Sequence, residues 1–149
     1  MKIGIATDHR GSEIKKELIE VLKNHGYEIH DYSPVNTPTD DYIDFAIATC
    51  KAYLNHEVDF GILLCRTGIG MSIAANKIKG IRCAKVTTKE EAELTRFDNN
   101  SNVIALNYNY PLEQLEELIV TFVESPFSNE ERHIRRVEKL SQLENMDVR

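Results

Sequence analysis

The stretch ILLCRTGIGMSIAANK, residues 62–77, places a cysteine directly before a glycine-rich loop. Cys65 ends an apolar run, two glycines follow, and a helical pattern begins at about Met71. Glycines let a backbone turn its N–H groups toward a ligand, and a thiol near a helix N-terminus is favoured as the reactive thiolate. The loop therefore predicts a base or nucleophile beside a site for a phosphate or a developing oxyanion. The alternative is a buried structural cysteine, the role that we expect for Cys50 and Cys83.

Two familiar anion-binding loops do not fit this stretch. The phosphate loop GxxxxGK[ST] is absent from the chain. A tyrosine-phosphatase loop requires an arginine six residues after its cysteine, and Met71 stands at that position. The Cys65 loop is therefore expected to serve another kind of anion chemistry.

Asp8 and His9 form a second polar group, at the end of the first β-type run. Taken alone, the pair is most simply a turn-forming aspartate and a surface histidine. If the strands that precede it and Cys65 are neighbours in a parallel sheet, both loops leave the sheet at the same edge. We then expect Asp8 and His9 to face Cys65 across a crevice.

A third group lies near the end of the chain, on the last helical pattern. Arg132 and Arg136 are four residues apart and share a helix face, with His133 beside them. Two arginines on one face suit a doubly charged phosphate. The alternative is a solvated basic face that pairs with neighbouring glutamates. The same helix has a narrow apolar seam, formed by Ile134, Val137 and Leu140, which predicts packing against a partner subunit.

The elements that must position these groups alternate between strand and helix. β-type runs cover residues 2–7, 27–32, 60–65, 81–86 and 102–107, and helical patterns cover residues 12–24, 41–54, 71–77, 88–97, 112–124 and 128–144. Asp40 or Asp41 is expected to cap the second helix, and Ser128 to Glu131 spell a capping box for the last. The pattern predicts one α/β domain over residues 1–149, with a doubly wound, Rossmann-like or flavodoxin-like, five-stranded parallel sheet. The common strand order 2-1-3-4-5 would open a crevice between the first and third strands.

Composition excludes several classes of function. The chain has 149 residues, 42% of them hydrophobic and 28% charged, and a net charge of −6. It has no block of Lys and Arg for a nucleic-acid backbone and no apolar run long enough to span a bilayer. Its three cysteines form no CxxC pair, so neither disulfides nor a zinc site are expected. We expect a cytoplasmic protein that binds neither nucleic acid nor membranes.

The motifs together resemble the family of ribose-5-phosphate isomerase B and the galactose-6-phosphate isomerase subunits. The matching segments are TDHRG at residues 7–11, CRTGIGMSIAANK at residues 65–77, GIR at residues 80–82 and RHIRRV at residues 132–137. The family pattern for the second segment is CGTGxGxSIAANK. The last segment follows Glu131, where the family has glycine.

The resemblance implies a metal-free and cofactor-free isomerase that interconverts aldose and ketose phosphates. It implies a homodimer at least, or a homotetramer, in which the partner chain completes each site around the phosphorylated sugar. Carried over by position, the catalytic residues are Cys65 as the proton-transferring base, with Thr67 and Asp98. The substrate-binding residues are Asp8, His9, Arg66, Gly68, Ile69, Gly70, Asn99, Arg132, His133 and Arg136, of which Arg132 and Arg136 clamp the phosphate.

Two departures from the family pattern bear on the substrate. Arg66 replaces the glycine that usually follows the cysteine, and Asp98 replaces the histidine that opens the furanose ring. A carboxylate with an ordinary pKa is a poor proton donor at neutral pH. We expect ribose 5-phosphate as substrate, with tetrulose or hexose phosphates and a non-catalytic sugar-phosphate binder as alternatives. A nucleotide-binding module is disfavoured because the first strand has no glycine fingerprint after it.

Overall fold

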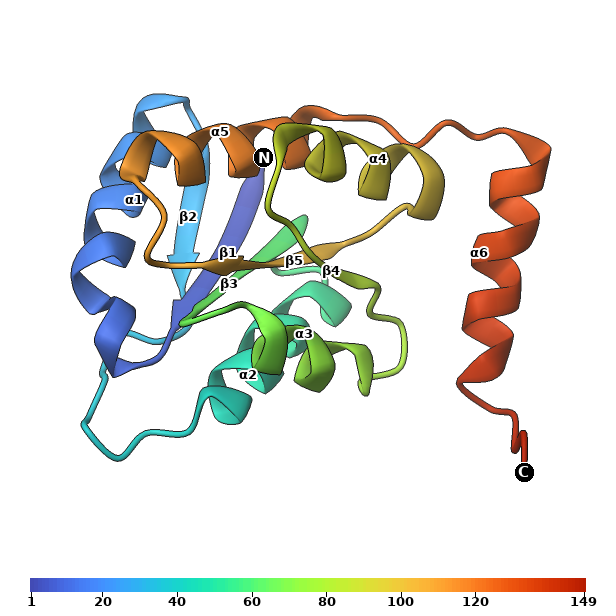
Figure 1. Cartoon of the computed structure of the whole chain (residues 1–149), viewed down its shortest axis with the longest axis horizontal. Helices are drawn as coiled ribbons and strands as arrows, with labels where there is room; N and C mark the ends of the chain where they lie inside the picture. Colours follow the sequence, from blue (N-terminus) through green and yellow to red (C-terminus); the bar gives the residue numbers. More distant parts are fainter.

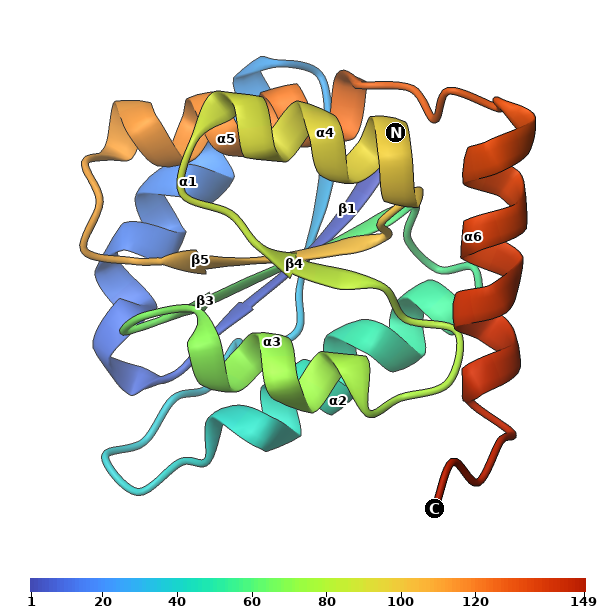
Figure 2. The same cartoon turned by 45° about the vertical axis from the view of Figure 1, so that its right-hand side comes forward.

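The computed structural model describes all 149 residues, Met1–Arg149, as a five-stranded parallel sheet between two layers of helices (Figures 1 and 2). The strands are β1 (Lys2–Thr7), β2 (Glu28–Asp31), β3 (Phe60–Cys65), β4 (Cys83–Lys85) and β5 (Val103–Asn107). The helices are α1 (Ser12–Asn24), α2 (Tyr42–Leu54), α3 (Ile69–Asn76), α4 (Lys89–Asn99), α5 (Leu112–Glu124) and α6 (Glu131–Leu143), with a short 3-10 helix at His9–Gly11. The predicted α/β class is confirmed.

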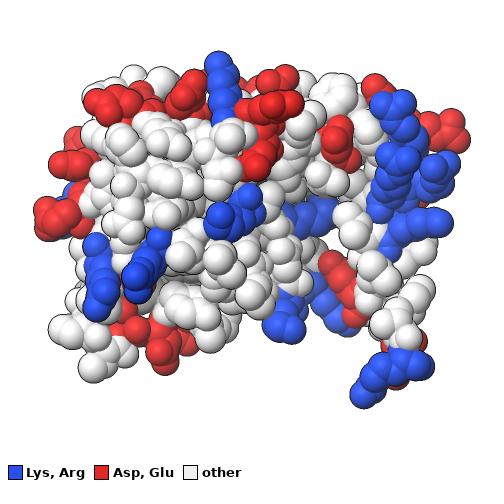
Figure 3. Space-filling model, in the orientation of Figure 1, with Lys and Arg blue, Asp and Glu red and all other residues white.

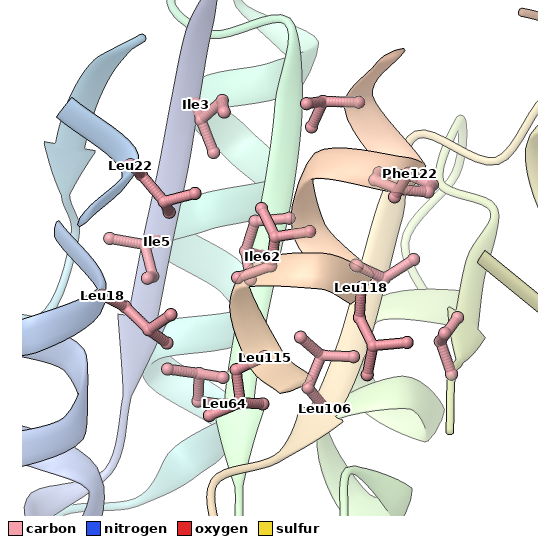
Figure 4. Close-up of a cluster of buried hydrophobic side chains, with 14 of the residues drawn as sticks. Ile3, Ile5, Leu18, Leu22, Ile62, Leu64, Leu106, Leu115, Leu118 and Phe122 are labelled. Atoms are coloured by element: carbon pink, nitrogen blue, oxygen red, sulfur yellow. The ribbon is translucent and has the colours of Figure 1, made fainter. Parts of the chain in front are cut away.

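Each face of the sheet has its own core, because successive residues of a strand point to opposite faces. On β3, Ile62 and Leu64 pack under α1, α4 and α5, in the cluster that Figure 4 shows. Leu63 and Cys65 point to the other face, under α2 and α3. Cys65 therefore belongs to the α2–α3 side of the sheet, at the point where β3 ends.

The strand order is β2-β1-β3-β5-β4, so the predicted order was correct for the first three strands and wrong for the last two. β5 is buried from Val103 to Leu106 and pairs with strands on both sides. β4 has only three residues, ends at the exposed Lys85 and pairs with β5 alone. A strand that is apolar throughout is stable inside a parallel sheet, whereas a short strand with a lysine suits an edge.

The helix bounds lie within two residues of the predicted ones except at the start of α6, which begins three residues later than predicted. Ser128 does not start a capping box, because α6 begins after Glu130 and no side chain caps it. The Ser128 hydroxyl lies 2.6 Å from Nδ1 of His133 instead. Asp41 occupies the N-cap position of α2 without a capping hydrogen bond, and the side chain of Asp40 bonds to His9. A genuine capping box is found at α4, where Thr88 is the N-cap.

α6 stands apart from the rest of the molecule, at the edge where β4 lies (Figures 1 and 2). It packs against α4, and its far end is tied to the α3–β4 connection by a hydrogen bond of 2.7 Å from Gly80 N to Glu144 Oε1. A cavity of about 520 Å³ separates α6 from the sheet. Leu140 and Leu143 remain 43% and 52% exposed, and basic side chains gather over the helix in Figure 3. None of the helices combines the length and the apolar character that a membrane span needs.

Candidate functional site

Cys65 lies at the carboxyl end of β3 and receives a hydrogen bond from the loop that follows. The backbone N–H of Gly68 donates to Sγ of Cys65 over 3.0 Å, and the residue is only 6% exposed. Gly68 has a φ of +83°, and a Cβ there would lie 3.2 Å from the carbonyl group of Ala105. Only glycine fits this turn without strain, and the turn directs the N–H of Gly68 toward the sulfur of Cys65.

The loop residues around the sulfur form the start of α3. Ile69 N donates to the hydroxyl of Thr67 over 3.1 Å, and Gly68 is the N-cap of the helix. The first N–H groups of a helix have no partners inside the helix, so they are available to an oxyanion. The side chain of Arg66 is exposed and makes no hydrogen bond or ion pair within the chain. A thiol, the first N–H groups of a helix and a free guanidinium thus share one loop.

Asp8 and His9 lie at the same ends of the strands as Cys65, the carboxyl ends. β1 pairs with β3 in parallel, with Thr7 opposite Leu64, so the residues that follow each strand are neighbours. The Asp8 carboxylate accepts from the backbone N–H of Arg10 over 3.1 Å and caps the 3-10 helix. The ring of His9 lies 3.0 Å from the Asp40 carboxylate through Nδ1. The structure therefore brings the two predicted loops together.

Two tyrosines belong to the same edge and were not singled out from the sequence. A Cβ at Gly70 would lie 2.8 Å from the Tyr42 ring, so Tyr42 covers the start of α3. Tyr108 N donates to the carbonyl of Cys65 over 3.0 Å, and its ring packs on Gly11. Burial and then the Asp8 carboxylate raise the pKa of Tyr108. Their positions in the sequence pattern could have indicated a place at the site, because Tyr42 opens a helix and Tyr108 directly follows a strand.

The remaining predicted residues lie away from Cys65, toward the ends of the strands at which the strands begin. α4 runs back against the strands, so Asp98 and Asn99 lie near the beginning of β4, where Asn99 O accepts from Arg82 Nε over 3.0 Å. A strand of six residues such as β3 separates the two edges by on the order of 15 Å. Within one chain, Asp98 and Asn99 therefore do not approach Cys65.

His133 fastens α6 to α4. Its side chain is 6% exposed, Nδ1 lies 2.6 Å from the Ser128 hydroxyl, and Nε2 lies 3.6 Å from the Asp98 carboxylate. Its ring meets Phe97 edge to face, with a centroid distance of 5.9 Å. Arg132 forms an ion pair of 2.9 Å with Glu130, and Arg136 is exposed without a partner in the chain. His133 thus holds the helix that presents the two arginines.

The arrangement suits proton transfer next to a carbonyl group. A sulfur base beside N–H donors can remove a proton from carbon while the donors stabilise the oxyanion that forms. No group of three or more His, Cys, Asp or Glu side chains is arranged to hold a metal ion.

Comparisons with known proteins identify the family. A family model described as Ribose/Galactose Isomerase matches residues 3–140. The putative sugar phosphate isomerase YwlF of Bacillus subtilis is 36% identical over 150 residues, which cover 99% of this chain and all of that protein. The structure of ribose-5-phosphate isomerase B from Clostridium thermocellum matches with a TM-score of 0.91 and 38% identity over 97% of this chain and 98% of that one. The ribose-5-phosphate isomerase B of Mycoplasma genitalium, with bound ribulose-5-phosphate, matches with a TM-score of 0.88 and 35% identity over 98% and 97%.

The fold and the thiol loop are therefore those of a sugar-phosphate isomerase. The chain belongs to the ribose/galactose isomerase family and is an enzyme of the ribose-5-phosphate isomerase B type. The resemblance drawn from the motifs is confirmed.

Proposed function

We infer that the enzyme interconverts ribose 5-phosphate and ribulose 5-phosphate, with Cys65 as the base. The observation that supports this most directly is the 3.0 Å hydrogen bond from Gly68 N to Sγ of Cys65, in a loop that also opens a helix. It lies beside Asp8 and His9, which suit the hydroxyl groups of a sugar. The relative from Mycoplasma genitalium, solved with ribulose-5-phosphate, supports the choice of a five-carbon substrate.

In the proposed reaction the thiolate of Cys65 removes the proton from C2 of the aldose. The electron pair forms the C1–C2 double bond, and the carbonyl oxygen on C1 becomes an oxyanion. The N–H groups of residues 66–70 and the Thr67 hydroxyl stabilise that charge. The proton of the C2 hydroxyl then passes to the oxyanion on O1, which becomes a hydroxyl, and the thiol returns its proton to C1 as the C2 carbonyl forms, so that a ketone remains at C2 and the thiolate is restored.

The phosphate is bound by Arg132 and Arg136 of a second copy of the chain in this proposal. These arginines lie on α6, away from Cys65. The thiol and the guanidinium groups of one chain therefore cannot contact the same small sugar. The exposed apolar side chains of α6, Leu140 and Leu143 among them, suit burial against another subunit. A homodimer, alone or paired into a homotetramer, would place α6 of each subunit over the thiol loop of the other.

Asp98 of the second copy takes the ring-opening step, with Asn99 of that copy beside it to bind the sugar, because neither residue approaches Cys65 of its own chain. Nε2 of His133 lies 3.6 Å from the carboxylate of Asp98, whose side chain is 43% exposed. Asp98 then accepts the proton of the anomeric hydroxyl, and His133 acts through Asp98 and Arg132 and does not touch the sugar. The presence of a carboxylate at this place also favours a second candidate, the isomerisation of a tetrulose phosphate, which cannot form the usual furanose ring.

Exchange of hydrogen with solvent tests the proposed function. In D₂O, the wild-type enzyme should introduce deuterium at C1 of ribulose 5-phosphate and at C2 of ribose 5-phosphate, and a panel of four- and six-carbon sugar phosphates should react more slowly. Cys65→Ser should abolish exchange while phosphate still protects the protein against thermal unfolding. Cys83→Ser is the matched control, since that thiol lies outside the loop. Binding of every sugar phosphate without exchange would mean a non-catalytic binder.

A further inference from the structure

We propose that Asp40 is a positioning residue, which holds the ring of His9 through Nδ1 so that Nε2 is the nitrogen left for the substrate. The role in the reaction rests on the proposed function, whereas the orientation of the ring can be tested without it. The evidence is the way in which the segment after β2 is bonded to the loop that carries Asp8 and His9.

Side chains of residues 33–40 continue the pairing of β1 after β2 has ended. Regular pairing stops at Asp31, opposite Ile5. The bonds that follow are Tyr32 N to Ile5 O (2.9 Å), Thr7 N to Ser33 Oγ (2.9 Å), Asn36 Nδ2 to Thr7 O (3.0 Å) and His9 N to Asp40 Oδ1 (3.3 Å). The backbone that presents Asp8 and His9 is thus held by three side chains of the neighbouring segment.

A buried lysine anchors the start of this segment. Lys15 is 3% exposed, and its ammonium group donates to Ser33 O over 2.6 Å and lies 3.0 Å from the Asp31 carboxylate. A buried charge is tolerated when it is paired and hydrogen-bonded in this way. The start of the segment is therefore held in place by α1, and the segment continues from there to His9.

Asp40 is the far end of the segment and binds four groups at once. Its side chain is 9% exposed. It lies 3.0 Å from His9 Nδ1 and 3.3 Å from His9 N, and it accepts from Asn36 Nδ2 and from Thr37 N, each over 3.1 Å. Burial alone would raise the pKa of Asp40, but hydrogen bonds from His9, Asn36 and Thr37 outweigh it and hold the pKa below its ordinary value. The carboxylate is therefore ionised at neutral pH.

An ionised carboxylate accepts and cannot donate, so Nδ1 of His9 must carry the proton in this contact. The partner of one ring nitrogen decides which nitrogen is left for the ligand. The His9 side chain is 34% exposed, and Nε2 has no partner in the chain. Asp40 thus leaves Nε2 as the ring nitrogen that can contact a sugar hydroxyl or the phosphate.

The nitrogen resonances of the histidine rings test the orientation directly. His9→Gln assigns the His9 signals in a long-range ¹H–¹⁵N spectrum of the wild-type protein. At a pH where the ring is neutral, we expect the proton on Nδ1. Asp40→Asn should shift part of the signal toward the form protonated on Nε2, whereas Asp44→Asn, an exposed aspartate of α2 without a side-chain bond, should leave it unchanged. A wild-type ring with a bare Nδ1 would overturn the proposal.

Turnover of ribose 5-phosphate tests whether Asp40 acts through His9. We expect Asp40→Asn to lower kcat/KM on the order of 10-fold. His9→Gln should lower it too, and the double variant should be no slower than His9→Gln alone, because the two residues act as one unit. Additive losses would refute this coupling. If the wild-type enzyme turns over no sugar phosphate, the proposed function fails, while the ring spectrum still decides the role of Asp40.

Discussion

The backbone N–H of Gly68 points at the sulfur of Cys65, and the chain can place it there only because residue 68 has no side chain. Gly68→Ala would strain a φ of +83° and press a methyl group against Ala105, which lies within 3.2 Å of the new carbon. We expect a loss of about 1–2 kcal/mol in the free energy of unfolding and a fall in kcat of on the order of 10²-fold, since the N–H leaves the sulfur.

Gly26 offers a matched control for this variant. Its φ is +89°, but a Cβ would meet nothing within 4 Å, and the residue follows α1 far from the thiol loop. Gly26→Ala should cost a similar amount of stability in urea unfolding and leave kcat unchanged. Equal losses of activity in the two variants would contradict a specific role for the Gly68 N–H.

Mixing two inactive variants tests whether the site is shared between subunits. Cys65→Ser removes the base, and Arg136→Ala removes a phosphate ligand. In a mixed dimer with a shared site, one site carries both changes and the other carries neither, so about a quarter of wild-type activity should return after refolding the two chains together. Each variant refolded alone is the control. A mixture that stays inactive would mean that Cys65 and Arg136 do not meet across subunits.

Replacing Asp98 distinguishes ring-forming from open-chain substrates. Asp98→Asn cannot accept a proton, so its kcat/KM for ribose 5-phosphate should fall on the order of 10²-fold. A tetrulose phosphate, which needs no ring opening, should be turned over at the wild-type rate. Asp98→His should restore the reaction with ribose 5-phosphate. Equal losses with both substrates would assign Asp98 to binding or to holding His133.

The stability of the protein in acid should depend on Asp40. Hydrogen bonds hold the pKa of Asp40 in the folded protein below its ordinary value, although burial opposes them. The folded state therefore gains stability from the ionised group above the unfolded pKa of about 3.9, and this gain is lost as the pH falls through the folded value. In urea unfolding, the gap between wild type and Asp40→Asn should be constant near neutral pH and close below about pH 4. Asp44→Asn should show no such change in gap.

The sequence allowed prediction of the elements and of the meeting between the two loops. Apolar runs such as FGILLC and the spacing of glycines locate the strands and turns with local information alone. The neighbourhood of β1 and β3 followed from the common strand order of five-stranded, doubly wound parallel sheets. The position of β5 between β3 and β4 was missed, although its continuous burial, against the exposed Lys85 in β4, is the physical reason for the order.

Contacts between distant loops were beyond local patterns. Asp40 or Asp41 was predicted to cap the second helix, a role that aspartates often have, and the N-cap position is that of Asp41. Asp40 bonds instead to His9, which is 31 residues away in the sequence. Tyr42 and Tyr108 reach the thiol loop only because the fold leaves no side chain at Gly70 and Gly11. Such contacts depend on where whole segments lie in the fold, and the spacing of residues within one segment does not predict this.

In the proposed assembly, the separation of α6 from the sheet makes the activity of the enzyme depend on the protein concentration. In the proposed assembly, the helix that supplies the guanidinium groups is tied to its own chain chiefly through α4, and it serves the sulfur of another molecule. Dilution below the dissociation constant of the dimer would leave intact, fully folded monomers that lack half of their binding groups. Specific activity would then fall when the enzyme is diluted. It would rise again when more chains are added, even if the added chains are the Cys65→Ser variant, because their arginines complete the sites of the wild-type chains.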